Sequence, residues 1–256
     1  MAGHSKWKQI KHYKAATDAK RGALFTKLIR EITVAARQGG GDPSGNPRLR
    51  TAIDAAKNAS MPKDNIERAV KKGTGELEGV DYQEVAYEAY APGGVALIIQ
   101  ALTDNPTRTV ADVRFKLSRA GGNLGSTNSV AWMFERKGQI YLDASRYADE
   151  EATLESALEA GAEDFFRDGE QYTITTDPTQ LHAVLTALQE AGVEASESEI
   201  GMIPKNTVRV EGRNAESVLK LIEDLEDLDD VQKVAANFDI DFDALEKQEM
   251  EIGNRK

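Results

Sequence analysis

Apolar side chains recur every three or four residues between residues 18 and 38, where they fall on one face of a predicted helix. The segment GGGDPSG ends this helix, because three glycines and a proline cannot continue it cheaply. A second helix is predicted from Pro47, with Asn46 as its N-cap. A third ends at Gly73 after two lysines. Together these helices can bury a small common core.

From about residue 80 the pattern becomes mixed. Residues 94–103 and 129–134 have the character of strands, with a helix over residues 106–119 between them. Residues 136–203 follow the order strand, helix, strand, strand, helix, strand, which is the split βαβ pattern. The segments on either side, when joined, repeat that order. We therefore expect one ferredoxin-like domain inserted into another, with a single larger α+β domain as the alternative.

These patterns predict a multidomain α+β protein with an N-terminal three-helix domain and two ferredoxin-like α+β domains. The expected divisions are a basic arm (1–17), the helical domain (18–75), a discontinuous first α+β domain (80–134 and 205–240), the inserted second α+β domain (135–204) and an acidic C-terminal tail (241–256).

Composition narrows the classes of protein that remain. The 256 residues include no cysteine, which excludes disulfides, thiolate metal sites and a cysteine nucleophile. The start of the chain lacks the apolar stretch of a secretory signal. The plain aliphatic run Val95–Ile99 is far shorter than the roughly 20 residues of a membrane-spanning helix. We expect a cytoplasmic protein without a membrane partner, with an organelle transit peptide as the alternative for the basic start.

Charge is divided unevenly along the chain, whose net charge is −11. Residues 1–73 hold 16 Lys or Arg against 6 Asp or Glu, whereas residues 74–256 hold 16 against 37. Such asymmetry is typical of a protein in which one part meets a polyanion and the rest avoids it.

The basic start is therefore the first candidate for a nucleic-acid contact. Cations neutralise phosphates and release counterions, and aromatic rings such as Trp7 and Tyr13 stack on exposed bases with about 1–3 kcal/mol each. A solvated tail with incidental lysines is the alternative. The candidate residues of the arm and first helix are His4, Ser5, Lys6, Trp7, Lys8, Lys11, Lys14, Lys20, Arg21, Lys27 and Arg30.

A second candidate patch follows on the next two helices. Lysines in a last helical turn also favour the helix dipole, which explains part of this patch without any ligand. Its members are Arg48, Arg50, Lys57, Lys63, Arg68, Lys71 and Lys72.

Two loops, TDNPTRT and GGNLGSTNSVAW, lie beside predicted strands, where backbone amides can hold a phosphate. However, GGNLG matches neither the dinucleotide fingerprint nor the P-loop. Turn glycines are the better interpretation of this segment.

No catalytic or metal-binding arrangement is recognisable. The histidines His4, His12 and His182 have no metal-ligand or triad spacing. The segment DIDFD begins like a calcium loop, but Ala244 stands where the turn needs glycine and Met250 where the loop ends in glutamate. We expect a protein that is not an enzyme and that carries no metal or cofactor.

The segments MAGHSKW, MPKDNIERAVKKG and GGNLG followed by SVAWMF resemble the YebC family over essentially the whole chain. The family motifs fall on Gly3–Trp7 and Met61–Ile66. The chain departs from the family at Pro106 and Thr107, where polar or basic residues are expected before Arg108, and this puts a shared contact site there in doubt.

The resemblance implies an α-helical N-terminal domain followed by two α+β domains. Members of the family are described as probable DNA-binding transcriptional regulators. Mitochondrial relatives are described as translational activators for a cytochrome oxidase subunit, and bacterial relatives are linked to the relief of ribosomes stalled on proline-rich sequence.

We expect a regulator of gene expression that binds nucleic acid, with ribosomal RNA preferred over duplex DNA as partner. In that role the basic arm would enter an RNA-lined cavity and assist translation. The alternative is a transcriptional regulator that places a helix of the N-terminal domain in the major groove. That alternative has few side chains for base readout: Arg48, Arg50, Lys57 and Asn58. A protein adaptor with the acidic segment LIEDLEDLDD is compatible with both, and the oligomeric state stays open.

Overall fold

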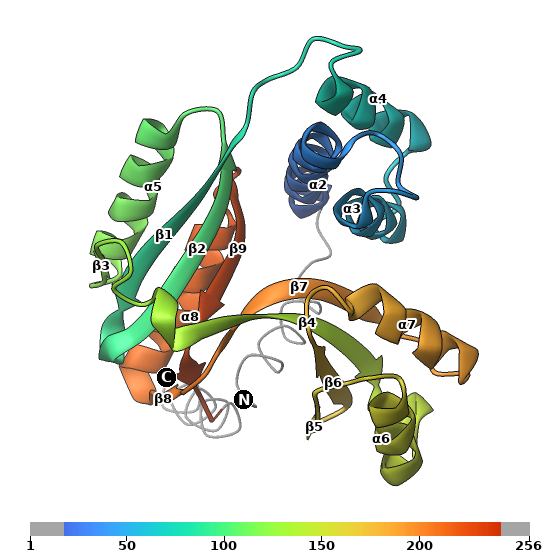
Figure 1. Ribbon diagram of the computed structural model, residues 1–256. Coiled ribbons are helices and arrows are strands. Elements are labelled where there is room, and N and C mark those ends of the chain that lie inside the picture. Colours follow the sequence, from blue (N-terminus) through green and yellow to red (C-terminus); the bar gives the residue numbers. More distant parts are fainter. Residues whose placement is uncertain (1–17, 242–256) are drawn as a thin grey trace.

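The computed structural model describes residues 18–241, so the predicted basic arm and all but the first residue of the predicted acidic tail lie outside the described residues. Figure 1 shows three parts: a helical domain, an outer α+β domain and an inserted α+β domain. The multidomain α+β class predicted from the sequence is confirmed. Among the helices of residues 18–241, none combines the length and apolarity that crossing a lipid bilayer requires.

The helical domain consists of α2 (Asp18–Gly39), α3 (Pro47–Asn58) and α4 (Lys63–Thr74). Their apolar faces form one cluster that includes Ile32, Leu49 and Ile66. Every residue of this cluster belongs to α2, α3, α4 or the turn before α4. The helical domain therefore has an apolar core of its own.

Asn46 fixes the angle between α2 and α3. Its Oδ1 accepts the amide hydrogen of Leu49 at 3.1 Å, which confirms the predicted N-cap. Its Nδ2 donates to the carbonyls of Ala35 and Gly40 at 2.8 and 2.9 Å. One buried side chain thus starts α3 and satisfies carbonyls at the end of α2.

The outer domain is an antiparallel sheet with the strand order β3-β1-β2-β9. Its helices α5 and α8 contribute Val113, Leu117, Val218 and Leu221 to the apolar cluster that also holds Leu97 of the sheet. A separate parallel pair, β8 with β10, follows at the edge of this domain. The elements are β1 (Gln83–Ala91), β2 (Val95–Thr103), α5 (Pro106–Arg119), β3 (Asn123–Leu124), β8 (Val208–Arg209), α8 (Gly212–Glu226), β9 (Val231–Ala236) and β10 (Phe238–Asp239).

Two details of the outer domain differ from the prediction. The strand predicted over residues 129–134 is wrong, because Ala131–Met133 form a short 3₁₀ helix. The position beside β2, which the ferredoxin-like order assigns to a strand near residue 208, is taken by β1. β1 and β2 pair over nine residues each around the turn Pro92–Gly94, and this local hairpin leaves β8 only two residues long.

The inserted domain agrees with the predicted order. Its sheet runs β5-β6-β4-β7, which is the strand order of a ferredoxin-like domain, with α6 and α7 packed on the face of Ile140 and Leu142. The elements are β4 (Phe134–Asp143), α6 (Glu150–Glu159), β5 (Asp164–Asp168), β6 (Gln171–Thr176), α7 (Leu181–Glu190) and β7 (Glu197–Pro204).

A continuous two-stranded ribbon joins the inserted domain to the outer one. β4 and β7 pair from Phe134 opposite Pro204 through to the far end of the inserted sheet. At the near end, Phe134 and Met202 pack in an apolar cluster with Ile98 of the outer sheet. The connection between these two domains is therefore ordered structure with apolar packing, visible in Figure 1 as the long strands β4 and β7.

Candidate nucleic-acid interface

Part of the predicted interface cannot be placed. His4, Ser5, Lys6, Trp7, Lys8, Lys11 and Lys14 lie outside the described residues, and Lys20 is on α2 with its side chain undescribed. For these residues the assignment stays a prediction.

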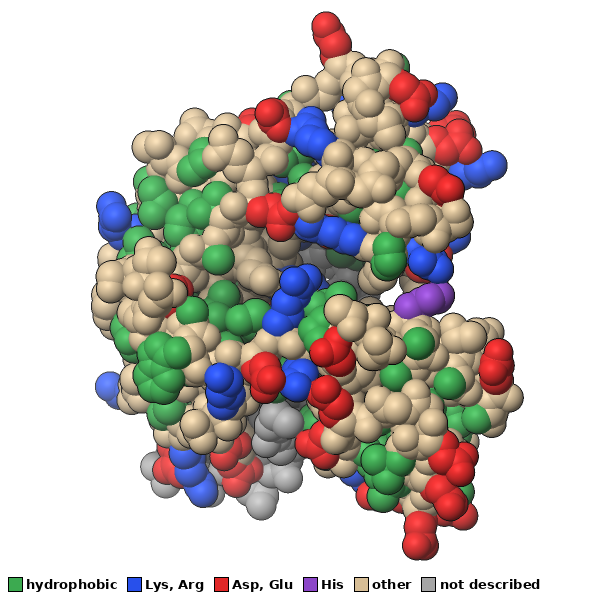
Figure 2. Space-filling model, in the orientation of Figure 1, with side chains coloured by type: hydrophobic (Ala, Val, Ile, Leu, Met, Phe, Trp, Pro, Cys, Tyr) green, Lys and Arg blue, Asp and Glu red, His purple; other side chains and the backbone are tan. Residues whose placement is uncertain are grey.

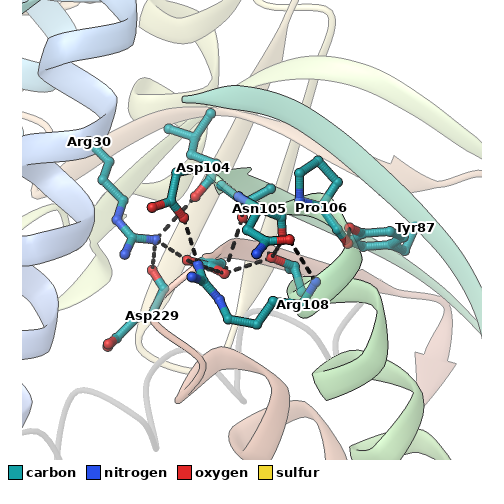
Figure 3. A network of polar contacts seen from close by, with 11 residues as sticks. Arg30, Tyr87, Asp104, Asn105, Pro106, Arg108 and Asp229 are labelled. Atoms are coloured by element: carbon teal, nitrogen blue, oxygen red, sulfur yellow. Dashed lines mark hydrogen bonds and ion pairs between the residues drawn. The ribbon is translucent and has the colours of Figure 1, made fainter. Parts of the chain in front are cut away.

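Arg30 and Lys27 of α2 face the outer domain. The Arg30 side chain is 13% exposed and forms an ion pair of 2.5 Å with Asp230. It also donates to the carbonyls of Leu102 at 3.1 Å and Asp229 at 2.8 Å (Figure 3). Lys27 donates to the carbonyl of Glu226. The sequence analysis predicted that these cations contact nucleic acid. In the structure their charged groups instead bind a carboxylate and backbone carbonyls of the outer domain, and so connect the helical domain to it.

Asp230 lies at the centre of this contact between the helical domain and the outer domain, which we call the joint. Besides Arg30, its carboxylate accepts from Arg108 at 2.8 Å, from Thr109 at 2.6 Å and from Thr103 at 3.2 Å. Burial alone would raise the pKa of Asp230, but the hydrogen bonds from Arg108, Thr109 and Arg30 outweigh it and lower the pKa to about 2. The carboxylate is therefore ionised at neutral pH, although the side chain is only 8% exposed.

The TDNPTRT loop has a structural role in this arrangement. Asn105 Oδ1 accepts the amide hydrogen of Arg108 at 3.1 Å and so caps α5. Tyr87 donates its hydroxyl hydrogen to the carbonyl of Pro106 at 3.3 Å (Figure 3). Arg108 itself is paired with Asp104 and Asp230. The cap and the ion pairs use the groups that a phosphate would need.

A cavity of about 450 Å³ opens beside this joint and is lined by Arg30, Tyr82, Arg108, Asp112 and further acidic residues. Five of its lining residues are aspartates and two are arginines. This balance repels phosphate, so the cavity does not suit a nucleic-acid backbone.

The GGNLGSTNSVAW loop does hold an anion, but the anion belongs to the protein. The carboxylate of Glu88 on β1 accepts the amide hydrogens of Asn128, Val130 and Ala131 at 2.6, 2.7 and 2.8 Å. Burial raises the pKa of Glu88, but the hydrogen bonds from these backbone amides outweigh it and lower the pKa. The amides that were candidates for a phosphate cradle are thus already occupied.

Two arginines of the second predicted patch also contact other domains. Arg48 on α3 is paired with Glu31 and, across the domain boundary, with Glu84 of β1, both at 2.7 Å. Arg50 Nη1 lies 3.0 Å from Nε2 of His182 on α7 of the inserted domain. Because arginine is only a donor, His182 accepts this hydrogen bond.

The rest of the second patch is exposed on the helical domain. Arg68 and Lys71 are exposed and Lys72 is half-buried, and none of the three side chains has a hydrogen-bond or ion-pair partner in the described part of the chain. We call these three residues the α4 basic face. Arg68 and Lys71 lie opposite Ile66 and Ala69, which are buried against α2 and α3, and Lys72 lies at the edge of that buried face. Figure 2 shows Lys and Arg side chains, among acidic ones, along the outer edge of this domain.

The remaining two cations of the patch are weakly engaged. Lys57 lies 3.0 Å from Asp54 and Lys63 lies 3.4 Å from Glu67, and all four side chains are exposed. Exposed pairs of this kind contribute little and leave the lysines accessible to another anion. No group of His, Asp and Glu within residues 18–241 has the geometry of a metal site.

Two models of one protein family match this chain. A family model described as "TACO1/YebC protein N-terminal domain" matches residues 5–76, and one described as "TACO1/YebC second and third domain" matches residues 82–238. The chain belongs to the TACO1/YebC family, as its sequence motifs predicted.

Relatives match over nearly their whole length. A protein from Gemmatimonas aurantiaca is 66% identical over 96% of this chain and 99% of its own length. Another from Geobacter sulfurreducens is 56% identical over the same shares. Both are named probable transcriptional regulatory proteins. The crystal structure of a conserved hypothetical protein from Aquifex aeolicus is 51% identical, with a TM-score of 0.81, over 88% of this chain and 92% of that one.

Proposed function

We propose that this protein is a non-enzymatic regulator of gene expression that binds ribosomal RNA through its basic arm and the α4 basic face and assists translation by relieving stalled ribosomes. The names of its relatives support a regulator. The confinement of excess positive charge to residues 1–73 supports a polyanionic partner for the N-terminal part.

The main support for the proposal is that some cations of the helical domain are paired with carboxylates whereas others are not. Arg30 and Arg48 are paired with carboxylates, whereas Arg68, Lys71 and Lys72 lie together without a partner among residues 18–241. Three unpaired cations on one helix face are suited to neighbouring phosphates.

RNA is preferred over duplex DNA for a structural reason. A helix that reads the major groove needs free side chains aimed at base edges. On α3 the arginines that would read bases, Arg48 and Arg50, are held by Glu84 and His182, which leaves Lys57 and Asn58. Sequence-specific DNA binding remains the second candidate, because the relatives are named as transcriptional regulators.

The test is co-sedimentation of the full chain with purified ribosomes at low and moderate salt. The variant Arg68→Glu/Lys71→Glu/Lys72→Glu is compared with Lys205→Glu/Arg213→Glu/Lys220→Glu, which changes the net charge equally at exposed cations of the other domains. We expect the first variant to lose at least tenfold in ribosome affinity and the second to bind like the wild type. Equal behaviour of the two variants would contradict the assigned face.

The arm is tested in the same assay by replacing Lys6, Lys8, Lys11 and Lys14 with glutamine in the full chain, and we expect weaker sedimentation. Duplex DNA decides between the two candidates. A DNA regulator discriminates among duplex sequences by about 10³-fold or more. If the wild type shows such discrimination and does not sediment with ribosomes, the translation role is wrong.

A further inference from the structure

The outward face of α5 in the outer domain presents an aromatic ring between two arginines. Val113 and Leu117 are buried against the sheet, so the helical spacing turns the positions between them outward. Phe115 is 62% exposed, and Arg114 and Arg119 are exposed beside it. We call Arg114, Phe115 and Arg119 the α5 stripe.

The two arginines differ from the other two cations of α5. Residues 74–256 contain 37 acidic residues against 16 basic ones, and neighbouring cations such as Arg108 and Lys116 are ion-paired, the latter with Asp224 at 3.5 Å. Arg114 and Arg119 have no hydrogen-bond or ion-pair partner among the described residues. The helix dipole accounts for a cation in the last turn, as at Arg119, but not for Arg114 in the middle of α5.

We propose that the α5 stripe is a second RNA contact, in which Phe115 stacks on one unpaired base while Arg114 and Arg119 neutralise phosphates on either side of it. This inference rests on the proposed function and adds a second RNA surface to the α4 basic face. Along the helix the two arginines are about 7.5 Å apart, at 1.5 Å per residue, with the ring between them. Stacking requires a base that is not enclosed in a duplex, so the partner is single-stranded or looped RNA.

The stripe and the α4 basic face lie on different parts of the molecule. Figure 1 shows α5 on the far side of the outer sheet from the helical domain that carries α4. Two separated contacts allow the protein to bridge two RNA segments, so that each binding event raises the effective concentration for the other.

The first test measures binding of a fluorescein-labelled 20-nucleotide oligouridine to the full chain across a range of salt concentrations. Arg114→Gln/Arg119→Gln is compared with Arg213→Gln/Lys220→Gln on the neighbouring helix α8, where both cations are also exposed. Loss of two phosphate contacts to a single strand lowers the slope of log K against log salt by about 1.4. We expect this change, with an at least tenfold loss of affinity, for the α5 variant alone.

The second test addresses the ring. Phe115→Leu keeps an apolar side chain but removes the π-face, and we expect at least a fivefold loss of oligouridine affinity. Phe115→Trp keeps an aromatic ring, and this variant should bind oligouridine at least as tightly as the wild type. A blunt 20-base-pair RNA duplex, whose bases are enclosed, should be insensitive to Phe115→Leu.

Three outcomes would overturn the inference. In the first, the α5 variants bind oligouridine as tightly as the α8 control. In the second, the wild-type protein sediments with ribosomes but has no measurable affinity for oligouridine. The third outcome has two parts: the protein binds poly-L-glutamate only when Arg114 and Arg119 are present, and Phe115→Leu changes the affinity for neither oligouridine nor poly-L-glutamate. That result would indicate that the stripe binds an acidic protein. All three leave the proposed function standing, since that depends on ribosome binding by the α4 basic face.

Discussion

Arg30 and Arg68 carry the same charge on the same domain, yet their surroundings assign them opposite roles. Arg30 is buried against a carboxylate and backbone carbonyls of the outer domain, whereas Arg68 is exposed without a partner in the described chain. A basic residue in a sequence is therefore only a candidate for nucleic-acid binding. Its environment decides whether the charge is available to a ligand.

At the same scale, Asp230→Asn should destabilise the fold by about 3 kcal/mol at neutral pH, because Arg30 is left without its charged partner in a mostly buried site. Urea denaturation measures the free energy of unfolding. Asp104→Asn is the control, since it removes an exposed partner of Arg108 and should cost less than about 1 kcal/mol.

The effect of Asp230→Asn should depend on pH. The pKa of Asp230 falls from 3.8 to about 2 on folding, so its ionised form contributes stability that is complete down to about pH 5 and is lost progressively as pH falls toward 2. Integration over this shift gives about 2 kcal/mol. The gap in unfolding free energy between wild type and variant should therefore narrow between pH 5 and pH 3. A gap that stays constant over this range would show that the charge of Asp230 does not carry the effect.

Glu88→Gln should loosen the loop that follows β3. The carboxylate accepts three backbone amide hydrogens, whereas a glutamine has one acceptor oxygen and would direct an NH₂ group at the remaining amides. We expect a loss of about 1–3 kcal/mol in unfolding free energy at neutral pH. Because the pKa of Glu88 is lowered on folding, the carboxylate's contribution is present above its unfolded pKa and disappears as pH falls through the folded value. Hydrogen exchange of the amides of Val130 and Ala131 should quicken.

At the scale of elements, Gly73 shows how closely α2 and α4 pack. A Cβ there would lie 2.4 Å from the carbonyl oxygen of Thr33 and 2.7 Å from Cβ of Ala36. Gly73→Ala should therefore destabilise the fold by about 1–3 kcal/mol in spite of the better helix propensity of alanine. Gly22→Ala is the matched control on α2, where nothing lies within 4 Å, and should stabilise by up to about 1 kcal/mol. If urea denaturation finds the two variants alike, the helices are not in the contact described.

Elements formed by interactions between neighbours in the sequence could be predicted, whereas elements that depend on residues far away in the sequence could not. The start of α3 was predicted because Asn46 and Pro47 act on their own neighbours. Gly73 was expected to end α4, yet the helix continues to Thr74 and Gly75 takes the left-handed conformation, since Gly73 serves the contact with α2. The strand expected over residues 129–134 failed because Glu88, about 40 residues away, binds the amides of that segment.

The candidate site was predictable only in part, for the same reason. Charge along the chain pointed to the helical domain, and the second candidate patch included Arg68 and Lys71, which the structure shows to be exposed. The partners of Arg30 and Arg50 are 200 and 132 residues away in sequence, so no local pattern could remove these arginines from the interface. The α5 stripe was missed because the charge of the chain was compared between residues 1–73 and residues 74–256, and the second part is acidic as a whole.

At the scale of the whole molecule, the two boundaries have different physical character. The ribbon of β4 and β7 joins the inserted domain through apolar packing of Phe134 and Met202. The apolar cluster of the helical domain contains no residue of another domain. Polar contacts cross this boundary, among them those of Arg30, Arg48 and Arg50. The helical domain should therefore be the part that detaches first.

Arg30→Gln/Arg48→Gln tests this difference. Hydrogen–deuterium exchange should quicken about tenfold in α2 and α3 relative to the outer sheet, because the boundary loses two of its arginine–carboxylate pairs. Lys57→Gln/Lys63→Gln, at exposed cations of the same domain, is the control and should leave exchange unchanged. Exchange that quickens equally in all three domains would contradict a detachable helical domain.

The shared ribbon also restricts how this chain can change length in evolution. Phe134 and Ile140 lie on the same face of β4, yet one packs on the outer sheet and the other in the inserted domain. One residue inserted between them would turn one of the two cores toward solvent. Viable insertions in the ribbon must come in even steps on both strands, and lineages that lengthen this protein are expected to do so in loops such as the one after α2.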